Sequence, residues 1–450
     1  MFDLLIRGGL FFGMTGDAPR PASIAVKDGK VSAILPPGAD AMAADSENIF
    51  DAAGLYVCPG FVDIHMHDER FEDPDTVQRC LIAQGVTTAV AGNCGSGPLF
   101  EKSLAARPRP WLHLSYLVGN RAGLREEVGR TDRYTPAAPA EIAQMCSLLR
   151  ESLQKGARGL SLGLEYAPGA SWEEIDALAA VTAEFGRIVT VHIRYDDDRC
   201  VGAVREMIRL SKENGVRLQV SHLGSMTMGH TRECETLIEE AAAEGVDVGF
   251  DCYPYDAFCT AAGSAVYDDG FVERWKGKGP ECLEAVSGRF RGSRLTFGTL
   301  AEMRREEPDG LIVAHVMDRE EIENCVANPA CIVASDALAA SGGAHPRIAG
   351  TFPRALGILR RRGYGWEDAL RKMTVMPADR MRLDAGRLYE GAAADITVFD
   401  PETFIDRATF QEPFTPPDGL KLVVIGGHVA LKDKKFSGEP HGSLERAPGP

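Results

Sequence analysis

The stretch PGFVDIHMH, residues 59–67, places two histidines two positions apart at the end of an apolar run rich in β-forming residues. Side chains at i and i+2 of a strand point to the same face, so His65 and His67 can bind one ion. The Pro-Gly pair limits where the strand begins, because proline cannot donate into a central ladder. The alternative is two surface histidines on an edge strand, and the pair alone does not decide between the two.

The composition is that of an ordinary soluble globular chain, with 450 residues, 44% hydrophobic and 25% charged. A net charge of −16 argues against binding to nucleic acid or to anionic membranes. No apolar run reaches the ~18 residues of a membrane span, and the first residues lack the pattern of a signal peptide. We therefore expect a cytoplasmic protein whose eleven cysteines are mostly reduced, one of them available as a ligand.

Strand and helix patterns alternate between residues 57 and 385. Short β-branched runs are separated by amphipathic segments such as 172–185 and 200–214; the runs lie at 85–90, 188–191, 217–220, 246–250, 311–314 and 331–334. This alternation predicts a parallel sheet covered by helices. A distorted (β/α)8 barrel fits the length, and a doubly wound open sheet is the alternative. Residues 258–304 lack the alternation and predict an insertion, for which a lid is one role.

Both ends of the chain show a pattern of short strands instead. Residues 1–56 read as short strands with an Asp-Gly hairpin turn at 28–29, and residues 386–436 contain similar strands. We expect the two ends to build one small β-domain with the barrel inserted between them. Residues 437–450 are rich in proline and glycine and predict a tail on the surface.

Polar residues follow the predicted strands at the points where barrels place their chemistry. They are His65 and His67, Cys94, His192, His222, Asp251, His315 and Asp336. A single histidine in such a position is commonly structural, but several histidines with a cysteine and an aspartate are the usual ligand set for Zn²⁺. A thiolate disfavours Mg²⁺ or Ca²⁺. The pattern predicts a metal site that contains Cys94.

These segments resemble the amidohydrolase superfamily, and within it the N-acyl-D-amino-acid deacylases (D-aminoacylases). The histidine pair marks the superfamily, whereas GNCG and the HPR segment are more specific to this branch. The matching segments are PGFVDIHMH, GNCG at 92–95, GLEYAPG at 163–169, HIR at 192–194, SH at 221–222, DCYPY at 251–255, SD at 335–336 and HPRIAGTFPR at 345–354.

The resemblance implies a barrel with a β-sandwich and a zinc-dependent hydrolase acting on a small molecule. It implies that Cys94, His192 and His222 hold a main Zn²⁺, and that His65, His67 and Asp336 form a second, more weakly occupied site. Zn²⁺ would activate water and polarise the scissile amide carbonyl, and Asp336 would act as general base and then general acid. Tyr166, Tyr253 and Arg347 would bind the substrate carboxylate.

The predicted reaction is hydrolysis of the amide bond of an N-acyl-D-amino acid or a related carboxylated N-acyl compound. The alternatives are hydrolysis of a cyclic amide, as in hydantoinases and dihydroorotases, and a non-catalytic metal-binding relative. Two positions depart from the family. Gly224 stands where the family usually has lysine, and Phe258 stands near a usual small hydroxyl residue. Arg194 is a candidate to replace the missing charge, and the oligomeric state is not predicted.

Overall fold

Eight parallel strands form the centre of the molecule, in the spatial order β17-β12-β11-β10-β9-β8-β7-β6. The computed structural model describes residues 1–39, 46, 48–69 and 74–449. The strands are β6 (Phe61–Met66), β7 (Val86–Ala91), β8 (His113–Gly119), β9 (Gly159–Gly163), β10 (Ile188–His192), β11 (Arg217–Val220), β12 (Val248–Cys252) and β17 (Cys331–Val333). Residues just after β17 complete the ring, since Asp336 N donates to His65 O at 2.7 Å and His67 N to Ala337 O at 2.8 Å. The predicted barrel is therefore confirmed, and the open sheet is wrong.

Helices cover the outside of this ring, as expected for parallel strands that are buried on both faces. The longer ones are α1 (Pro74–Ile82), α2 (Phe100–Ala106), α3 (Pro139–Gln154), α4 (Trp172–Glu184), α5 (Cys200–Asn214), α7 (Thr231–Ala243), α10 (Arg319–Ala327), α11 (Arg347–Arg361), α12 (Trp366–Arg371) and α13 (Val375–Met381). Helix α5 shows the pattern: Ala203, Val204, Met207 and Leu210 form a buried stripe at helical spacing. It ends at Gly215, whose φ of +62° suits glycine.

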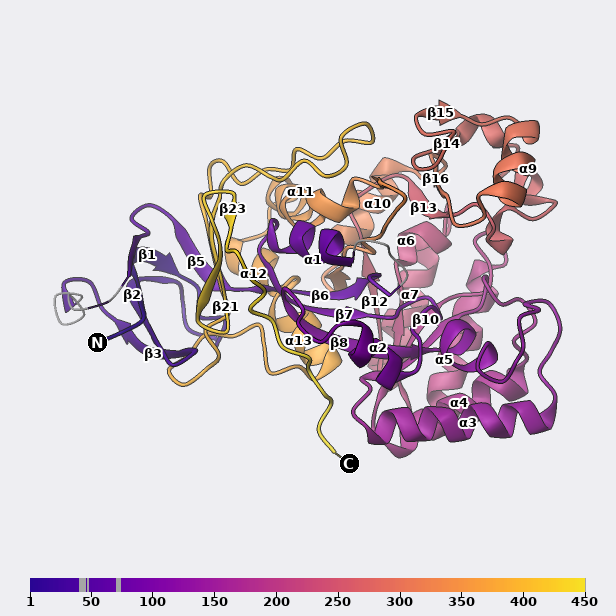
Figure 1. Cartoon of the computed structure of the whole chain (residues 1–450), viewed down its shortest axis with the longest axis horizontal. Coiled ribbons are helices and arrows are strands. Elements are labelled where there is room, and N and C mark those ends of the chain that lie inside the picture. Colours follow the sequence, from indigo (N-terminus) through magenta and orange to yellow (C-terminus); the bar gives the residue numbers. More distant parts are fainter. Residues whose placement is uncertain (40–45, 47, 70–73, 450) are drawn as a thin grey trace.

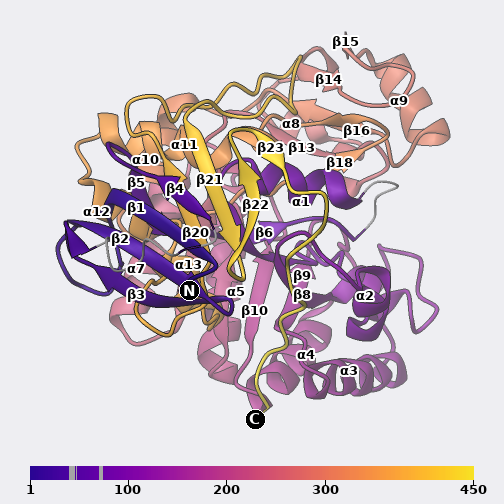
Figure 2. The same ribbon diagram turned by 60° about the vertical axis from the view of Figure 1, so that its left-hand side comes forward.

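The two ends of the chain form one nine-stranded sheet beside the barrel (Figures 1 and 2). Its strands are β1 (Leu4–Phe11), β2 (Arg20–Lys27), β3 (Lys30–Leu35), β4 (Ile49–Asp51), β5 (Tyr56–Pro59), β20 (Ile396–Phe399), β21 (Leu420–Ile425), β22 (His428–Lys432) and β23 (Lys435–Phe436). The two halves join where β20 pairs antiparallel with β5. Ile6 and Val26 from one end share a core with Ile396 and Leu422 from the other.

The C-terminal segment lies along the barrel. Ser443 O accepts from Leu114 N at 2.9 Å, and Glu445 N donates to Leu114 O at 2.8 Å. Ala447 N donates to Gly156 O at 2.9 Å, and its side chain is buried. The segment predicted as a surface tail is thus held beside β8 by backbone hydrogen bonds.

The insertion between β12 and α10 is a separate small unit at one end of the barrel (upper right in Figure 1). It contains the four-stranded sheet β13 (Phe258–Ala261), β16 (Leu311–Ala314), β14 (Leu283–Ala285) and β15 (Ser293–Arg294), with α8 (Phe271–Arg274), α9 (Phe297–Glu306) and the 3₁₀ turns Ala265–Tyr267 and Pro280–Cys282. Its core includes Phe271, Trp275 and Leu283. The remaining elements are the pair β18 (Ala339–Ala340) and β19 (Gly343–Ala344), the short helix α6 (Leu223–Met226) and the π-helical turn η2 (Asn120–Arg125).

The predicted strands differ from the structure at one run, and two barrel strands lie outside the predicted runs. The run 311–314 forms β16 of the insertion, not a barrel strand, so the insertion extends beyond residue 304. An apolar run shows that a strand is buried but not which sheet buries it. Strands β8 and β9 take the remaining places in the barrel, although their sequences HLSYLVG and GLSLG lack the β-branched pattern of the predicted runs.

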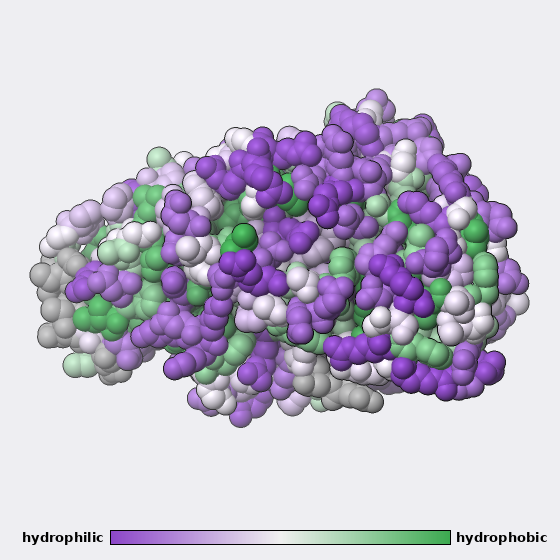
Figure 3. All heavy atoms as spheres, turned by 90° about the horizontal axis from the view of Figure 1, so that it is seen from above, coloured by the Kyte–Doolittle hydropathy of each residue, from purple (hydrophilic) through white to green (hydrophobic). Residues whose placement is uncertain are grey.

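Within the described residues, no helix is long and apolar enough to cross a bilayer. On the face of the molecule shown in Figure 3, hydrophilic residues predominate and hydrophobic ones lie in small separate patches.

One buried carboxyl group joins the barrel to the insertion. Asp196, in the connection after β10, is 3% exposed and accepts from Trp275 Nε1 at 2.7 Å. Arg274 Nε lies 3.5 Å from its other oxygen. Burial, together with the charge of Glu165, raises the pKa of Asp196 to about 7. This carboxyl group therefore changes its protonation near neutral pH.

The raised pKa predicts a pH-dependent stability. Between about pH 4 and pH 7 the folded chain holds a proton that the unfolded chain has released, so stability falls as pH rises through this range. Asp196→Asn removes this titration. Between pH 5 and pH 8, the free energy of unfolding is expected to fall by about 2 kcal/mol more in the wild type than in this variant. Urea unfolding of both proteins at the two pH values measures the difference. Equal losses would contradict the assignment to Asp196.

Candidate metal centre

Six side chains from the carboxyl ends of five strands meet in the mouth of the barrel. They fall into two groups that share Cys94, and the ligand atoms within each group lie within 4.8 Å of one another. One group is Cys94, His192 and His222, and the other is His65, His67, Cys94 and Asp336. The structure thus brings together all six residues that the sequence predicts as ligands.

The potential ligand atoms of these side chains lie close to one another. Cys94 Sγ lies 3.3 Å from His65 Nε2 and 3.4 Å from His222 Nε2, and His192 Nδ1 lies 3.1 Å from His222 Nε2. Asp336 Oδ1 is 3.3 Å from His65 Nε2 and 3.2 Å from His67 Nε2. Thiolate, imidazole and carboxylate converging in this way match the donor set of Zn²⁺.

In three of the four histidines, the ring nitrogen that points away from the other ligands has a hydrogen-bond partner that fixes the ring. His67 Nδ1 lies 2.9 Å from Glu69 Oε1, and His192 Nε2 lies 2.9 Å from Glu165 Oε2. His222 Nδ1 is 3.1 Å from Ser225 Oγ. For the fourth, Asp251 Oδ1 lies 3.5 Å from His65 Nδ1. Such outer partners orient histidines at metal sites and leave the inner nitrogen free to bind.

Three of the six residues have a left-handed backbone, which is rare for residues other than glycine. Their φ angles are +52° at Cys94, +35° at His222 and +50° at Asp336. Each follows the end of its strand and turns the chain so that the side chain points into the ring. Strain of this kind is typical of functional sites. Close packing helps to hold the turn, since a Cβ on Gly163 would lie 2.1 Å from Cys94 O.

The charges in the centre favour a cation. Burial opposes ionisation of the thiol, but His65 and His222 lower the pKa of Cys94 well below its ordinary value. Burial also opposes ionisation of Asp336, yet Arg347 and His65 hold its pKa well below the usual range. Two anionic groups in a buried site need compensating positive charge, which a bound metal ion supplies.

A cavity of about 350 Å³ opens above these residues. Cys94, Asp336, Tyr166 and Arg347 line it, together with residues of the insertion such as Thr260 and Ser264. Arg347 is 1% exposed. Its Nη2 lies 2.9 Å from Asp336 Oδ2 and donates to Cys259 O at 3.2 Å. Its Nε and Nη1 are buried and have no hydrogen-bond partner among the described residues.

The two predicted tyrosines occupy different positions. Tyr166 lines the cavity, with its ring centre 4.4 Å from that of His192. The ring of Tyr253 instead supports Arg347, whose guanidinium carbon lies 4.7 Å from the ring centre, and its hydroxyl points to Met317. His345, in the same segment as Arg347, accepts from the Arg347 backbone N–H at 3.0 Å and so helps to start α11.

The departures from the family also have structural explanations. A Cβ on Gly224 would lie 2.5 Å from Ile322 Cδ1, so the position is closed by packing. Phe258 packs on Trp275 in the insertion, and Thr260 lines the cavity nearby. Arg194 pairs with Glu206 at 3.1 Å and does not replace the missing charge.

His315 lies outside the site, and this sequence prediction was wrong. It follows β16 of the insertion and lies 3.1 Å from Glu284. Conversely, sequence reasoning missed the roles of Glu69 and Glu165, which contact His67 and His192. The only signal was their position, two residues after His67 and directly before Tyr166.

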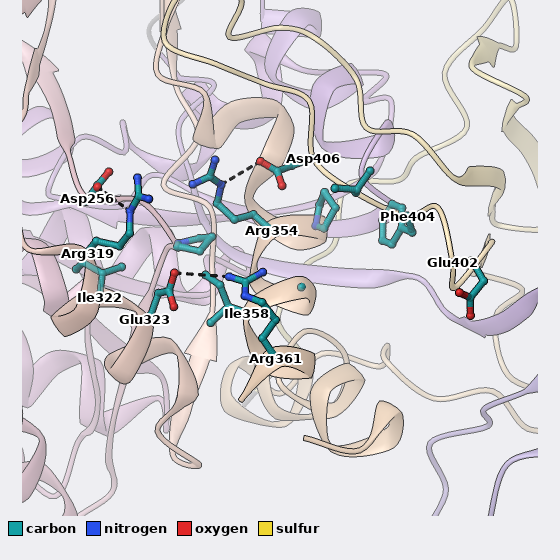
Figure 4. A pocket seen from close by; sticks show the side chains of 14 residues that line it. Asp256, Arg319, Ile322, Glu323, Arg354, Ile358, Arg361, Glu402, Phe404 and Asp406 are labelled. Carbon is teal, nitrogen blue, oxygen red and sulfur yellow. Dashed lines mark hydrogen bonds and ion pairs between the residues drawn. The ribbon is translucent and has the colours of Figure 1, made fainter. Parts of the chain in front are cut away.

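A second cavity, of about 370 Å³, lies on the outer side of α11 (Figure 4). No histidine or cysteine is among its described lining residues. Its arginines are engaged with carboxylates: Arg319 with Asp256 at 3.2 Å, Arg354 with Asp406 at 3.0 Å and Arg361 with Glu323 at 3.6 Å. The chemistry is therefore concentrated in the cavity at the barrel mouth.

Comparison with known proteins agrees with this site. A sequence profile described as Amidohydrolase family matches residues 48–254 and 323–431. The chain belongs to this amidohydrolase family. The unmatched interval between the two parts contains the four-stranded insertion of this amidohydrolase.

Two relatives from Alcaligenes xylosoxydans xylosoxydans cover nearly the whole amidohydrolase chain. N-acyl-D-glutamate deacylase is 32% identical over 99% of this chain and 96% of its own length. D-aminoacylase is 32% identical over 98% of this chain and 97% of its own. The crystal structure of N-acyl-D-glutamate deacylase from Bordetella bronchiseptica, complexed with zinc and a phosphonate inhibitor, superposes with a TM-score of 0.87 at 30% identity, covering 99% and 100% of the two chains. This amidohydrolase is a metal-dependent enzyme.

Proposed function

We propose that this amidohydrolase cleaves the amide bond of N-acyl amino acids with Zn²⁺ as its cofactor. The observation that carries the proposal is the position of Arg347, which lines the cavity beside Asp336 and has two buried nitrogens without a hydrogen-bond partner among the described residues. A carboxylate bound there would bring a neighbouring amide over the metal centre. The D configuration is taken from the names of the relatives, N-acyl-D-glutamate deacylase and D-aminoacylase.

The donor set fits zinc. Cys94, His192 and His222 would hold the main ion, and His65, His67 and Asp336 a second, weaker one beside the shared Cys94. Zn²⁺ bound there would activate a water molecule and polarise the scissile carbonyl. The outer contacts of Glu69, Glu165 and Ser225 would keep each inner histidine nitrogen available as a ligand.

Asp336 would move the proton. Its Oδ1 faces His65 and His67, and its Oδ2 faces Arg347. The low pKa keeps this carboxylate ionised at neutral pH, so it can accept a proton from the attacking water and pass it to the leaving amine. When Arg347 also binds the substrate carboxylate, its charge is shared between two anions, which makes Asp336 a stronger base.

Arg347 would bind the substrate carboxylate, and Tyr166 would line the same cavity. Tyr253 would act through Arg347, by holding the guanidinium plane against its ring. No lysine is among the described residues that line the cavity, which argues against a lysine-bridged centre of the kind that hydrolases of cyclic amides usually use.

A substrate screen tests the proposal. N-acetyl, N-formyl and N-succinyl amino acids of both configurations are incubated with zinc-loaded protein, alongside hydantoin and dihydroorotate. We expect zinc-dependent hydrolysis of D substrates, with kcat/KM falling at least about 100-fold in Arg347→Met while zinc content is unchanged. Turnover of L substrates only, or of cyclic amides only, would contradict the proposal.

A further inference from the structure

The cavity above the metal centre has a second positively charged wall. Arg121 and Arg133 line it together with Arg347. Arg121 belongs to η2 after β8, and Arg133 to the connection between η2 and α3. Neither residue contributes to the metal groups or to the proposed carboxylate clamp, so the mechanism leaves both of them without a function.

The two charged walls lie on opposite sides of the ring. Arg347 stacks on Tyr253, which follows β12, and pairs with Asp336, which follows β17. Arg121 follows β8, four strands from β12 in the eight-stranded order. The Arg121 backbone N–H donates to Gly95 O at 3.2 Å, so the backbone of Arg121 lies next to the turn that contains Cys94. A molecule that spans the cavity from Arg347 to Arg121 crosses the metal centre.

The insertion holds the second wall in place. Arg133 Nη1 donates to Gly263 O at 2.9 Å. The next residue, Ser264, lines the same cavity, is 7% exposed, and its hydroxyl has no hydrogen-bond partner among the described residues. A buried polar group without a partner is costly unless a ligand or water satisfies it. This hydroxyl is therefore an independent indication that a polar group binds here.

Among the described residues, the acidic side chains near this cavity are engaged with other groups or exposed to solvent. Glu69 is engaged with His67 and Ser96, and Asp336 with His65, His67 and Arg347. Glu126 lies 3.7 Å from Arg121 Nη1 but is partly solvated. Asp309 lines the cavity from the insertion and is exposed. Arg133, held by a backbone carbonyl, and the unpartnered Ser264 hydroxyl therefore favour an anion on this side of the cavity.

The wall next to Arg347 is different, because it is apolar. Cys259, Leu311, Leu338 and Ala340 line the cavity there and belong to one hydrophobic cluster. In an N-acyl amino acid, the side chain branches from the carbon that carries the α-carboxylate. With that carboxylate on Arg347 and the amide over the metal centre, the side chain meets the apolar wall, and the acyl group extends toward Arg121.

We propose that the acyl group of the substrate carries a terminal carboxylate, as in a succinyl group, and that Arg121 and Arg133 bind it. The proposal rests on the proposed function, which places the amino-acid half at Arg347. It names these two arginines as specificity-determining residues and predicts an apolar amino-acid side chain.

Paired acyl groups that differ only in charge test the proposal. N-succinyl-D-leucine and its terminal carboxamide are compared as substrates of the zinc-loaded enzyme. We expect kcat/KM to be at least about tenfold higher for the carboxylate, and Arg121→Gln and Arg133→Gln to bring the ratio near one. Arg130→Gln is the matched control, because Arg130 lies in the same connection and pairs with Glu141. No preference in the wild type, or a preference that survives both variants, would overturn the proposal.

Two further comparisons separate the possible sources of failure. N-acetyl-D-glutamate and N-acetyl-D-glutamine test the side chain, and an arginine-dependent preference for glutamate would overturn the assignment to the acyl group. Calorimetric binding of succinate and succinamate to the zinc-loaded protein needs no turnover. Tighter binding of succinate that is lost in both arginine variants would support the subsite even if the proposed hydrolysis failed, and equal binding would overturn it.

Discussion

Replacing Cys94 with alanine is expected to abolish activity by removing the bound metal. Cys94 is the one residue common to both ligand groups, and its Sγ lies within 3.4 Å of His65 and His222 nitrogens. Loss of an outer contact of a ligand commonly lowers metal affinity 10–100-fold, so loss of the shared ligand itself should lower zinc affinity at least about 100-fold. Zinc content after gel filtration and kcat/KM for an N-acyl-D-amino acid are the measurements.

The matched control is Cys252→Ala. Cys252 is also fully buried at the carboxyl end of a barrel strand, but it belongs to neither ligand group. This variant should keep its zinc and most of its activity, which separates a metal effect from loss of a buried thiol. If Cys94→Ala keeps its full zinc content, Cys94 is not a ligand.

Asp336→Asn is expected to lower kcat by about 10²–10⁴-fold while zinc remains at the main site. The amide keeps the shape of the carboxylate but cannot accept a proton from water. The group Cys94, His192 and His222 does not include Asp336, so its ion should stay, whereas the second site should lose affinity. Steady-state kinetics and zinc analysis of the same preparation test both parts.

Stability must be checked in this variant, because Arg347 is fully buried and would lose its 2.9 Å partner. The melting temperature therefore accompanies the kinetics. Asp309→Asn is the control, since this carboxylate lines the same cavity but is exposed and touches neither ligand group. A rate for Asp336→Asn equal to that of the wild type would exclude Asp336 as the proton carrier.

The barrel and its polar strand ends could be predicted because they depend on local patterns. The runs that became β6, β7, β10, β11, β12 and β17 are short, apolar and spaced by amphipathic helices. In a parallel barrel all carboxyl ends meet at one face, so His65, Cys94, His192 and Asp336 had to come near one another. The same reasoning failed for His315, because the run 311–314 is as apolar as a barrel strand but is buried by the insertion.

The orientation of the site residues could not be predicted in the same way. The contact between Glu165 and His192 joins the ends of two neighbouring strands. The rings of Tyr166 and Tyr253 have similar sequence contexts, yet one lines the cavity and the other supports Arg347. These differences depend on side-chain packing, which a single sequence does not specify position by position.

By itself, the sequence determined the fold class and the set of residues that meet at the barrel mouth, because periodicity and strand order act through the backbone. Only the tertiary structure decided that Cys94 belongs to both ligand groups, since that depends on left-handed turns at Cys94, His222 and Asp336. It also decided that Arg121 and Arg347 line one cavity. The separation of Arg121 and Arg347 along the chain does not predict this, because closure of the barrel decides which strand ends border the same cavity.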